Sequence, residues 1–389
     1  MARTSLFPPK GRRTINSSAP TAGGLKAIAE NIKSGAGMRR KDAGLKTRSK
    51  DLDPSDFIST GSTLLNLALT DRKDSGFRKG RMVNLVGDSS AGKSFLALTV
   101  LAEAAQSPEF EEYRLIYDDA ENALCFDMVK LFGKKASKRI DTTIKSDTVQ
   151  KWKKNMIRLV EDGIPFIYVL DSFDSLTSTE ALDRAIKAAK SDGDEGGSYK
   201  TEKPRIGSET ASMLVEPIAE TGSILIIVSQ TRDNIGVTFG EKKTRSGGKW
   251  LQFYSTHVPW MAILERERHE VTVNGKKVKR VTGVHTRVRC KKNKVTGKER
   301  ECEISISYDY GIDDIYSNIK FLVESGTWSS KSGYIVPEGI ADEKMRADDL
   351  RQYVEDNNLE EDLKEKVVDL WHELYNLFKP DRKKKYRGI

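Results

Sequence analysis

The feature that most constrains this chain is an eight-residue segment, Gly87-Asp88-Ser89-Ser90-Ala91-Gly92-Lys93-Ser94, which fits the pattern G-x-x-x-x-G-K-[ST]. The apolar run 82–86 precedes it and the alanine- and leucine-rich run 95–105 follows it, which predicts a strand, a glycine-rich turn and a helix. Backbone N–H groups and the helix dipole favour phosphate at such a helix N-terminus. We therefore expect the eight residues to bind a nucleotide, with Lys93 reaching its β- and γ-phosphates and the Ser94 hydroxyl binding Mg²⁺. A chance match in a glycine-rich turn is the alternative, and the flanking strand and helix argue against it.

Charge is distributed unevenly along the 389 residues. Residues 1–50 hold twelve Lys and Arg but only Glu30 and Asp42, a net charge of +10, whereas the whole chain carries +9. A basic arm on a nearly neutral body indicates a polyanionic partner, nucleic acid above all, although a solvated leader without a partner has the same composition. The cluster at 382–387 is a second basic segment, which is also consistent with a solvated tail.

The composition argues against membrane and secreted classes of protein. No apolar run approaches the roughly 20 residues that span a bilayer, and the N-terminal segment lacks the apolar region of a secretory signal. Cys125, Cys290 and Cys302 share no close spacing and no histidine partner. This pattern argues against a zinc site and a disulfide framework, and it favours a reducing compartment.

Apolar runs alternate with helical patterns through the first two thirds of the chain. They predict strands at 82–86, 113–117, 166–170 and 224–228, helices at 93–105, 125–132, 147–161 and 208–220, and a mobile loop at 191–198. This order is typical of an α/β fold with a mainly parallel sheet, in which ligands bind beyond the carboxyl ends of the strands. Asn274-Gly275 predicts a type I′ hairpin, and strands at 286–290 and 301–308 extend the sheet with antiparallel pairs.

Changes in composition divide the chain into four predicted segments: a basic arm with a short helix (1–50), an α/β core (51–312), a small, mostly helical C-terminal domain (313–378) and a basic tail (379–389). The arm helix places Leu25, Ile28 and Ile32 on one face, and it is too short to bury that face alone. It must dock on its own body or on a neighbouring subunit. In the C-terminal domain one apolar helical face is predicted to be core, including Trp371 and Phe378.

Three polar side chains lie where predicted strands end. Asp171 closes an apolar strand, a pattern in which the carboxylate positions Mg²⁺, although an Asp at this place also begins turns. Glu121 follows the strand 113–117 and would polarise an attacking water; alternatively it is an exposed loop acid. Gln230 follows the strand 224–228 and would sense the γ-phosphate; alternatively it is a turn residue.

The loop 231–248 is too long and too rich in glycine and basic residues to be a simple connector. Backbone amides, basic side chains and apolar wedges suit single-stranded nucleic acid, whose bases can be spread and stacked. The predicted DNA-binding residues of this loop are Arg232, Asn234, Ile235, Gly236, Phe239, Lys242, Lys243, Arg245, Gly247 and Gly248.

Taken together, the motifs resemble those of the RecA-type recombinases. The matching segments are Ser59-Thr60-Gly61, Asp119-Ala120-Glu121-Asn122-Ala123-Leu124, Val169-Leu170-Asp171-Ser172, Gln230-Thr231-Arg232 with 234–240, Ser246-Gly247-Gly248 leading to Phe253-Tyr254, and Lys292-Asn293-Lys294. Their order and spacing match over about residues 24–378. Size and divergence resemble phage-encoded, UvsX-like members, whereas the C-terminal region 346–374 is more similar to the bacterial form.

The resemblance implies a RecA-like core and an ATP-dependent filament on single-stranded DNA that pairs the strand with a homologous duplex. It implies that Lys93, Ser94 and Asp171 bind ATP and Mg²⁺, that Glu121 is the catalytic carboxylate, and that Gln230 is the γ-phosphate switch. It places this activity in the cytoplasm of a bacterial or phage-infected cell, with no membrane partner. Single-strand-binding and loader proteins are further partners that it suggests.

The resemblance also implies contacts between subunits. Lys292 and Lys294 would reach the ATP of the neighbouring subunit, and Phe253 would lie at that interface. The helix with Leu25, Ile28 and Ile32 would be the arm that docks on the next subunit.

Three departures from the family pattern affect these expectations. Cys125 and Met128 stand where the family usually has Asp and Tyr to hold adenine, so Phe126 is expected to compensate. Ala211 stands where the first DNA loop usually has Arg, so Lys203 or Arg205 is expected to substitute in a region that is longer than usual. The tail is basic rather than acidic.

Two other functions are alternatives to the recombinase. A hexameric helicase or translocase of the same fold superfamily would usually carry an arginine finger and a primase-binding or N-terminal helical domain, and neither is evident in the sequence. A non-hydrolysing recombination accessory protein would not need Glu121.

Overall fold

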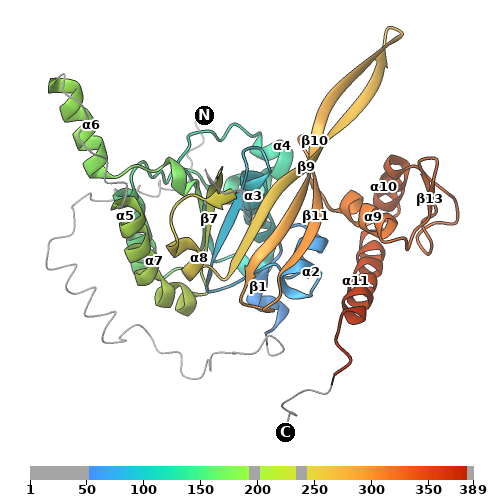
Figure 1. Cartoon of the computed structure of the whole chain (residues 1–389), viewed down its shortest axis with the longest axis horizontal. Helices are drawn as coiled ribbons and strands as arrows, with labels where there is room; N and C mark the ends of the chain where they lie inside the picture. Colours follow the sequence, from blue (N-terminus) through green and yellow to red (C-terminus); the bar gives the residue numbers. More distant parts are fainter. Residues whose placement is uncertain (1–51, 192–201, 234–242, 383–389) are drawn as a thin grey trace, which may run out of the picture. The chain divides into compact units, whose positions relative to one another are not determined.

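The computed structural model describes residues 52–191, 202–233 and 243–382 (Figure 1). The chain divides into residues 1–51 and the compact unit 52–389, and only the second unit is described below. The predicted arm helix, with Leu25, Ile28 and Ile32, therefore lies outside the described residues, as do most of the loop 191–198 and the centre of the loop 231–248.

A ten-stranded sheet lies at the centre of the described unit. Its strands are β3 (Arg81–Gly87), β4 (Arg114–Asp119), β5 (Ile140–Asp141), β6 (Phe166–Asp171), β7 (Ile224–Asp233), β8 (Lys243–Arg245), β9 (His257–Val273), β10 (Lys276–Asn293), β11 (Arg300–Ser307) and β12 (Gly311–Asp313). They follow the order β12-β11-β10-β9-β3-β7-β6-β4-β5, and β8 pairs with β7. Strands β9, β3, β7, β6, β4 and β5 are parallel, and β10 to β12 continue the sheet in antiparallel pairs. The predicted fold class is therefore confirmed.

The helices are α2 (Thr63–Thr70), α3 (Lys93–Gln106), α4 (Met128–Arg139), α5 (Val149–Glu161), α6 (Thr179–Ser191), α7 (Glu202–Thr221), α8 (Trp250–Tyr254), α9 (Asp314–Glu324), α10 (Ala347–Asp356) and α11 (Glu360–Leu377). Three-residue 3₁₀ helices lie at Pro54–Asp56, Pro108–Phe110 and Phe173–Ser175. Two small antiparallel pairs join β1 (Phe57–Ile58) to β2 (Phe77–Arg78) and β13 (Ser330–Lys331) to β14 (Tyr334–Ile335).

Several element boundaries differ from those predicted from the sequence. Helix α4 begins at Met128 rather than at Cys125, because the Asp127 side chain caps it by accepting from two backbone N–H groups of the first turn. The sequence pattern predicted no helix at α6, and it placed the start of the helix α7 at residue 208, six residues too late. Pro204 lies in the first turn of α7, where a helix tolerates proline. The predicted strand 286–290 is the last part of β10.

The parallel register aligns the carboxyl ends of the central strands. Gly87 of β3 pairs with Gln230 of β7, and Asp119 of β4 pairs with Asp171 of β6. The P-loop and the three polar strand ends predicted from the sequence therefore share one edge of the sheet, where parallel α/β sheets bind their ligands.

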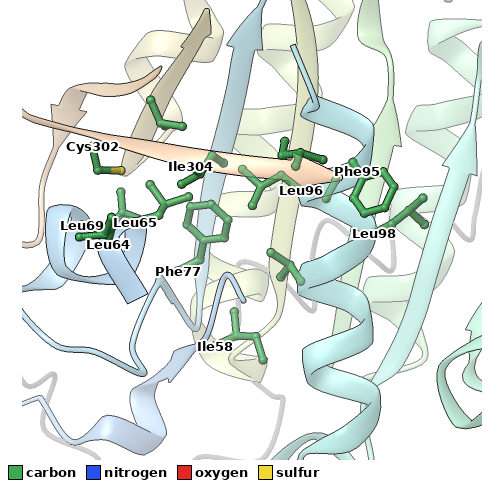
Figure 2. Close-up of a cluster of buried hydrophobic side chains, with 14 of the residues drawn as sticks. Ile58, Leu64, Leu65, Leu69, Phe77, Phe95, Leu96, Leu98, Cys302 and Ile304 are labelled. Atoms are coloured by element: carbon green, nitrogen blue, oxygen red, sulfur yellow. The ribbon is translucent and has the colours of Figure 1, made fainter. Parts of the chain in front are cut away.

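Apolar side chains cover both faces of the sheet. On one face, Phe77, Leu96 and Ile304 are buried among residues of α2, α3 and the antiparallel strands (Figure 2). On the other face, Trp152 of α5, Phe173 and Trp250 of α8 pack with ring centroids 5.2 to 6.3 Å apart. Every residue of β6 is buried, which explains its continuous apolar sequence.

The C-terminal helices pack on the first of these two faces. Arg300 of β11 forms a buried ion pair with Asp71 at the end of α2, and its guanidinium lies 4.1 Å from the centre of the Tyr375 ring on α11. Trp371 is buried as predicted. Phe378, predicted to be core, instead exposes 81% of its surface, because α11 ends at Leu377 and its last turn extends beyond its contacts.

A long hairpin joins β9 to β10. Asn274 and Gly275 have φ angles of 50° and 73°, as a type I′ turn requires, which confirms the predicted hairpin. Among the described helices, none has the length and apolar character needed to cross a membrane.

Replacement of Asp314 should show how much the hydrogen bonds between α9 and α2 contribute to the free energy of unfolding. The Asp314 carboxylate accepts hydrogen bonds from the backbone N–H and the hydroxyl of Thr63, both at 2.7 Å. Asp314→Ala should lower the free energy of unfolding by about 1–3 kcal/mol, because buried donors lose their partner. Asp309→Ala, which removes an exposed ion pair with Lys130, should lower it by less than about 1 kcal/mol. Equal losses in urea unfolding of the two variants would contradict this account.

Candidate nucleotide-binding site

The backbone of the P-loop has a conformation that lets a ligand approach it closely. Gly92 is the N-cap residue just before α3 and has a φ of 88°, and no described side chain caps this helix with a hydrogen bond. At Gly87 an added Cβ would lie 2.5 Å from the carbonyl oxygen of Met261, so the turn has room for glycine alone. The first N–H groups of α3 are therefore left for a ligand, and the dipole there favours an anion.

Lys93 lies at the start of α3 with its side chain largely buried. Its Nζ donates to the carbonyl oxygen of Asp88 at 2.6 Å. Burial lowers the pKa of Lys93, and the nearby carboxylates of Asp171 and Glu121 partly offset that shift. The Lys93 ammonium, which donates to this loop carbonyl, therefore lies where it could donate to a phosphate.

Asp171 and Ser94 meet beside Lys93 and fit a magnesium site. Burial raises the pKa of the Asp171 carboxyl, and hydrogen bonds from Ser94 and Tyr117 counteract the shift. The Tyr117 hydroxyl donates to Asp171 at 2.5 Å and fixes its orientation. Among the described residues, no group of three or more His, Cys, Asp or Glu could hold a metal by itself. Such a site suits Mg²⁺, which keeps several waters and takes further oxygens from phosphates.

Glu121 and Gln230, predicted separately from two strand ends, are brought together. The Glu121 carboxylate accepts from the Ser172 hydroxyl at 2.7 Å and from the Gln230 side-chain amide at 3.2 Å. The backbone N–H of Gln230 donates to the Asp174 carboxylate at 2.8 Å. The positioning roles of Asp174 and Tyr117 were not predicted, because their partners lie on other strands.

Asp88 connects the P-loop to both described ends of the loop 231–248. One of its carboxylate oxygens accepts from the Thr231 hydroxyl, and the other forms an ion pair with Lys243 at 2.5 Å. Lys243, predicted to bind DNA, forms this ion pair while half of its side chain stays exposed. The sequence carries no signal for this contact beyond the unlike charges.

The other predicted DNA-binding residues occupy varied positions. Lys203 donates to the carbonyl oxygens of Asp174 and Leu176, and burial lowers its pKa to about 8. Arg205 and Arg232 are exposed, and Arg245 bonds the side chain of Gln252. Gly247 and Gly248 have positive φ angles and pack against aromatic side chains. Five predicted residues lie outside the described ones: Asn234, Ile235, Gly236, Phe239 and Lys242.

Residues predicted to act across a subunit interface lie together around α8. Lys292 donates to the backbone carbonyl oxygens of Gln252 and, at 3.0 Å, of Phe253. Burial and the neighbouring charges of Lys294 and Arg245 lower the pKa of Lys292 to about 8. The Phe253 side chain exposes 72% of its surface. One short helix therefore holds the lysine and presents the phenylalanine.

Phe126 lies on the rim of the same site. Its ring packs edge-on against Phe95 in the first turn of α3, with centroids 5.4 Å apart, and 41% of its surface is exposed. This position suits the expected stacking on a base. The neighbouring Cys125 is exposed.

Comparisons with known proteins agree with this geometry. The family model for the RecA N-terminal domain matches residues 24–313. The chain is similar to Protein RecA of Clostridioides difficile, with 29% identity over 88% of this chain and 91% of the relative. It is also similar to Protein RecA of Colwellia psychrerythraea (30% identity, 77% and 81% covered) and of Corynebacterium jeikeium (27%, 93% and 89% covered).

Two substitutions should separate nucleotide binding from turnover. Lys93→Ala removes the cation aimed at the phosphates and should abolish both. Glu121→Gln keeps the shape of the side chain, so ATP should bind within about twofold of wild type while turnover falls roughly 10²–10⁴-fold. Lys151→Ala, on a surface ion pair, serves as the control and should change neither. Near-normal hydrolysis by Lys93→Ala would refute the site.

Proposed function

This chain belongs to the RecA family, and on that premise we propose that it is an ATP-dependent DNA recombinase. It acts as a DNA-dependent ATPase that assembles into helical filaments on single-stranded DNA. Within the filament it pairs the bound strand with a homologous duplex and exchanges strands.

The observation that carries this proposal is the double contact of Asp88. The side chain holds Thr231, just before the central part of the predicted DNA loop, and Lys243, just after it. Anionic phosphates in the P-loop compete with Asp88 for the nearby lysines and repel its carboxylate. Nucleotide binding would therefore release both ends of the loop together, and the loop would become available to DNA.

The chemistry assigned to the site follows from its contacts. Lys93 and the N–H groups at the start of α3 bind and orient the phosphates, and Ser94 and Asp171 hold Mg²⁺, which neutralises developing charge. The Glu121 carboxylate accepts a hydrogen bond from the attacking water and orients it in line. Gln230 donates to Glu121, so a γ-phosphate that attracts its amide would transmit a signal into the loop that follows β7.

Self-assembly is supported by the surface around α8. Phe253 is a large apolar side chain that is almost fully exposed, which marks a contact surface. Lys292, whose pKa lies near 8, is bound to the same short helix. We assign Phe253 to the subunit interface, and Lys292 and Lys294 to the ATP of the neighbour.

The proposal also covers the subgroup of the family, the cellular location and the further partners. The size of the chain and its divergence from the bacterial relatives, 27–30% identity, support a phage-encoded, UvsX-like member that acts in the bacterial cytoplasm. Single-strand-binding and loader proteins are the further partners it implies, and residues 1–50 serve as its basic arm.

Single-stranded DNA should raise the rate of ATP hydrolysis several-fold, because filament assembly completes the site between subunits. The stimulation should weaken steeply as salt increases, since DNA phosphates supply much of the affinity. Electron microscopy with ATP and single-stranded DNA should show open helical filaments. A hydrolysis rate indifferent to DNA, or closed rings in the images, would favour a translocase or an accessory protein instead.

A further inference from the structure

Helix α6 is amphipathic, yet nothing in its own unit buries its apolar face. Leu182 and Ile186 lie one turn apart and expose 47% and 45% of their surfaces, and Ala185 and Ala189 lie on the same face. In the part of α6 whose burial is described, 179–190, no side chain is buried. A helix with such a face normally packs it against another surface.

A shallow groove with polar and apolar side chains lies between α7 and α8. It has a volume of about 600 Å³ and is lined by Arg205, Ser208, Glu209, Ser212, Met213 and Tyr254. Ser208 and Ser212 lie one turn apart on α7. Because both side chains are small, they leave a depression in the helix surface that can accept the side chains of another helix. Met213 adds an adaptable apolar wall, and the exposed Phe253 extends the apolar surface along the chain from Tyr254.

The charges beside the two surfaces are complementary when the helices run in the same direction. Along one flank of α6, Asp183 precedes Lys190. Along the exposed side of α7, Arg205 precedes Glu209 and Glu216. Glu209 also pairs with Lys153 and Arg205 of its own chain. The acidic part of α6 then meets the basic start of α7, and the basic part of α6 meets the later acids.

The first turn of α6 is fixed where α7 begins, which directs it away from the groove of its own chain. Ser178 donates to Glu202 at 2.7 Å, and Gln150 donates to Glu180 at 2.6 Å. From this base α6 extends away from α5 and α7 (Figure 1). The occupant of the groove must therefore come from elsewhere.

We propose that the apolar face of α6 docks into the α7–α8 groove of a second copy of this chain. The two surfaces are different, so the contact is head-to-tail, the arrangement that generates open filaments or rings. The groove is continuous with Phe253, the residue assigned above to the subunit interface. This inference rests on the proposed function, because it names a contact within the proposed filament.

Cross-linking between differently labelled copies tests the contact directly. In a Cys125→Ser background, which removes the exposed cysteine, Ile186→Cys and Ser212→Cys are made in separate proteins. A short bis-maleimide should join them into a species of twice the chain mass when they are mixed with ATP and single-stranded DNA. Neither protein should give this cross-linked species on its own. The double variant in one chain should not cross-link within itself when diluted without nucleotide. No product from the mixture, or cross-linking confined to single chains, would overturn the proposal.

A matched pair of α6 variants tests whether the contact matters for assembly. Leu182→Gln/Ile186→Gln should raise the protein concentration needed for half-maximal DNA-stimulated hydrolysis roughly tenfold or more, because two apolar side chains lose their burial. Arg184→Gln, on the opposite face of α6, should leave it unchanged. Both proteins should melt like wild type, since these positions are exposed. If wild type responds to DNA and the apolar variant responds equally, this inference fails while the proposed function stands; if wild type ignores DNA, the proposed function fails.

Discussion

The register of the parallel strands determines where the chemistry of this protein can lie. Gly87 pairs with Gln230 and Asp119 with Asp171, so four parallel strands carry their polar ends to the same edge of the sheet. The P-loop, the Asp171 carboxylate and the Glu121–Gln230 pair all lie at that edge. A shift of one strand by a single residue would turn its side chains to the opposite face and separate the groups. The buried aromatic and aliphatic layers on both faces hold the register.

Asp88 joins this edge of the sheet to the loop that follows β7. Its backbone carbonyl engages Lys93, and its carboxylate engages Thr231 and Lys243. One residue of the P-loop thus contacts Lys93 and both described ends of the proposed DNA loop. Charge-assisted hydrogen bonds of this kind are stronger than neutral ones, so under the proposed function their exchange for phosphate contacts would shift the loop between two states.

The sequence predicted the sheet, the P-loop and the strand-end residues because each depends on a local pattern. The apolar strand ending in Asp171 and the Asn274-Gly275 turn are patterns of this type. The Asp88–Lys243 pair was not predictable, since 155 residues separate its members and only the fold brings them together. Helix α6 was missed because its polar composition resembled that of a loop, and the exposure of Phe378 was missed because periodicity does not show where packing ends.

The central claim is that Asp88 links nucleotide binding to DNA binding, and the affinity for fluorescent single-stranded DNA tests it most directly. It should be measured by anisotropy with and without a non-hydrolysable ATP analogue, in wild type, Asp88→Ala and the surface control Asp147→Ala. The nucleotide should tighten DNA binding strongly in wild type and in the control. In Asp88→Ala the ratio of the two dissociation constants should shrink by roughly tenfold, because the loop is already released. An unchanged ratio in Asp88→Ala would contradict the account.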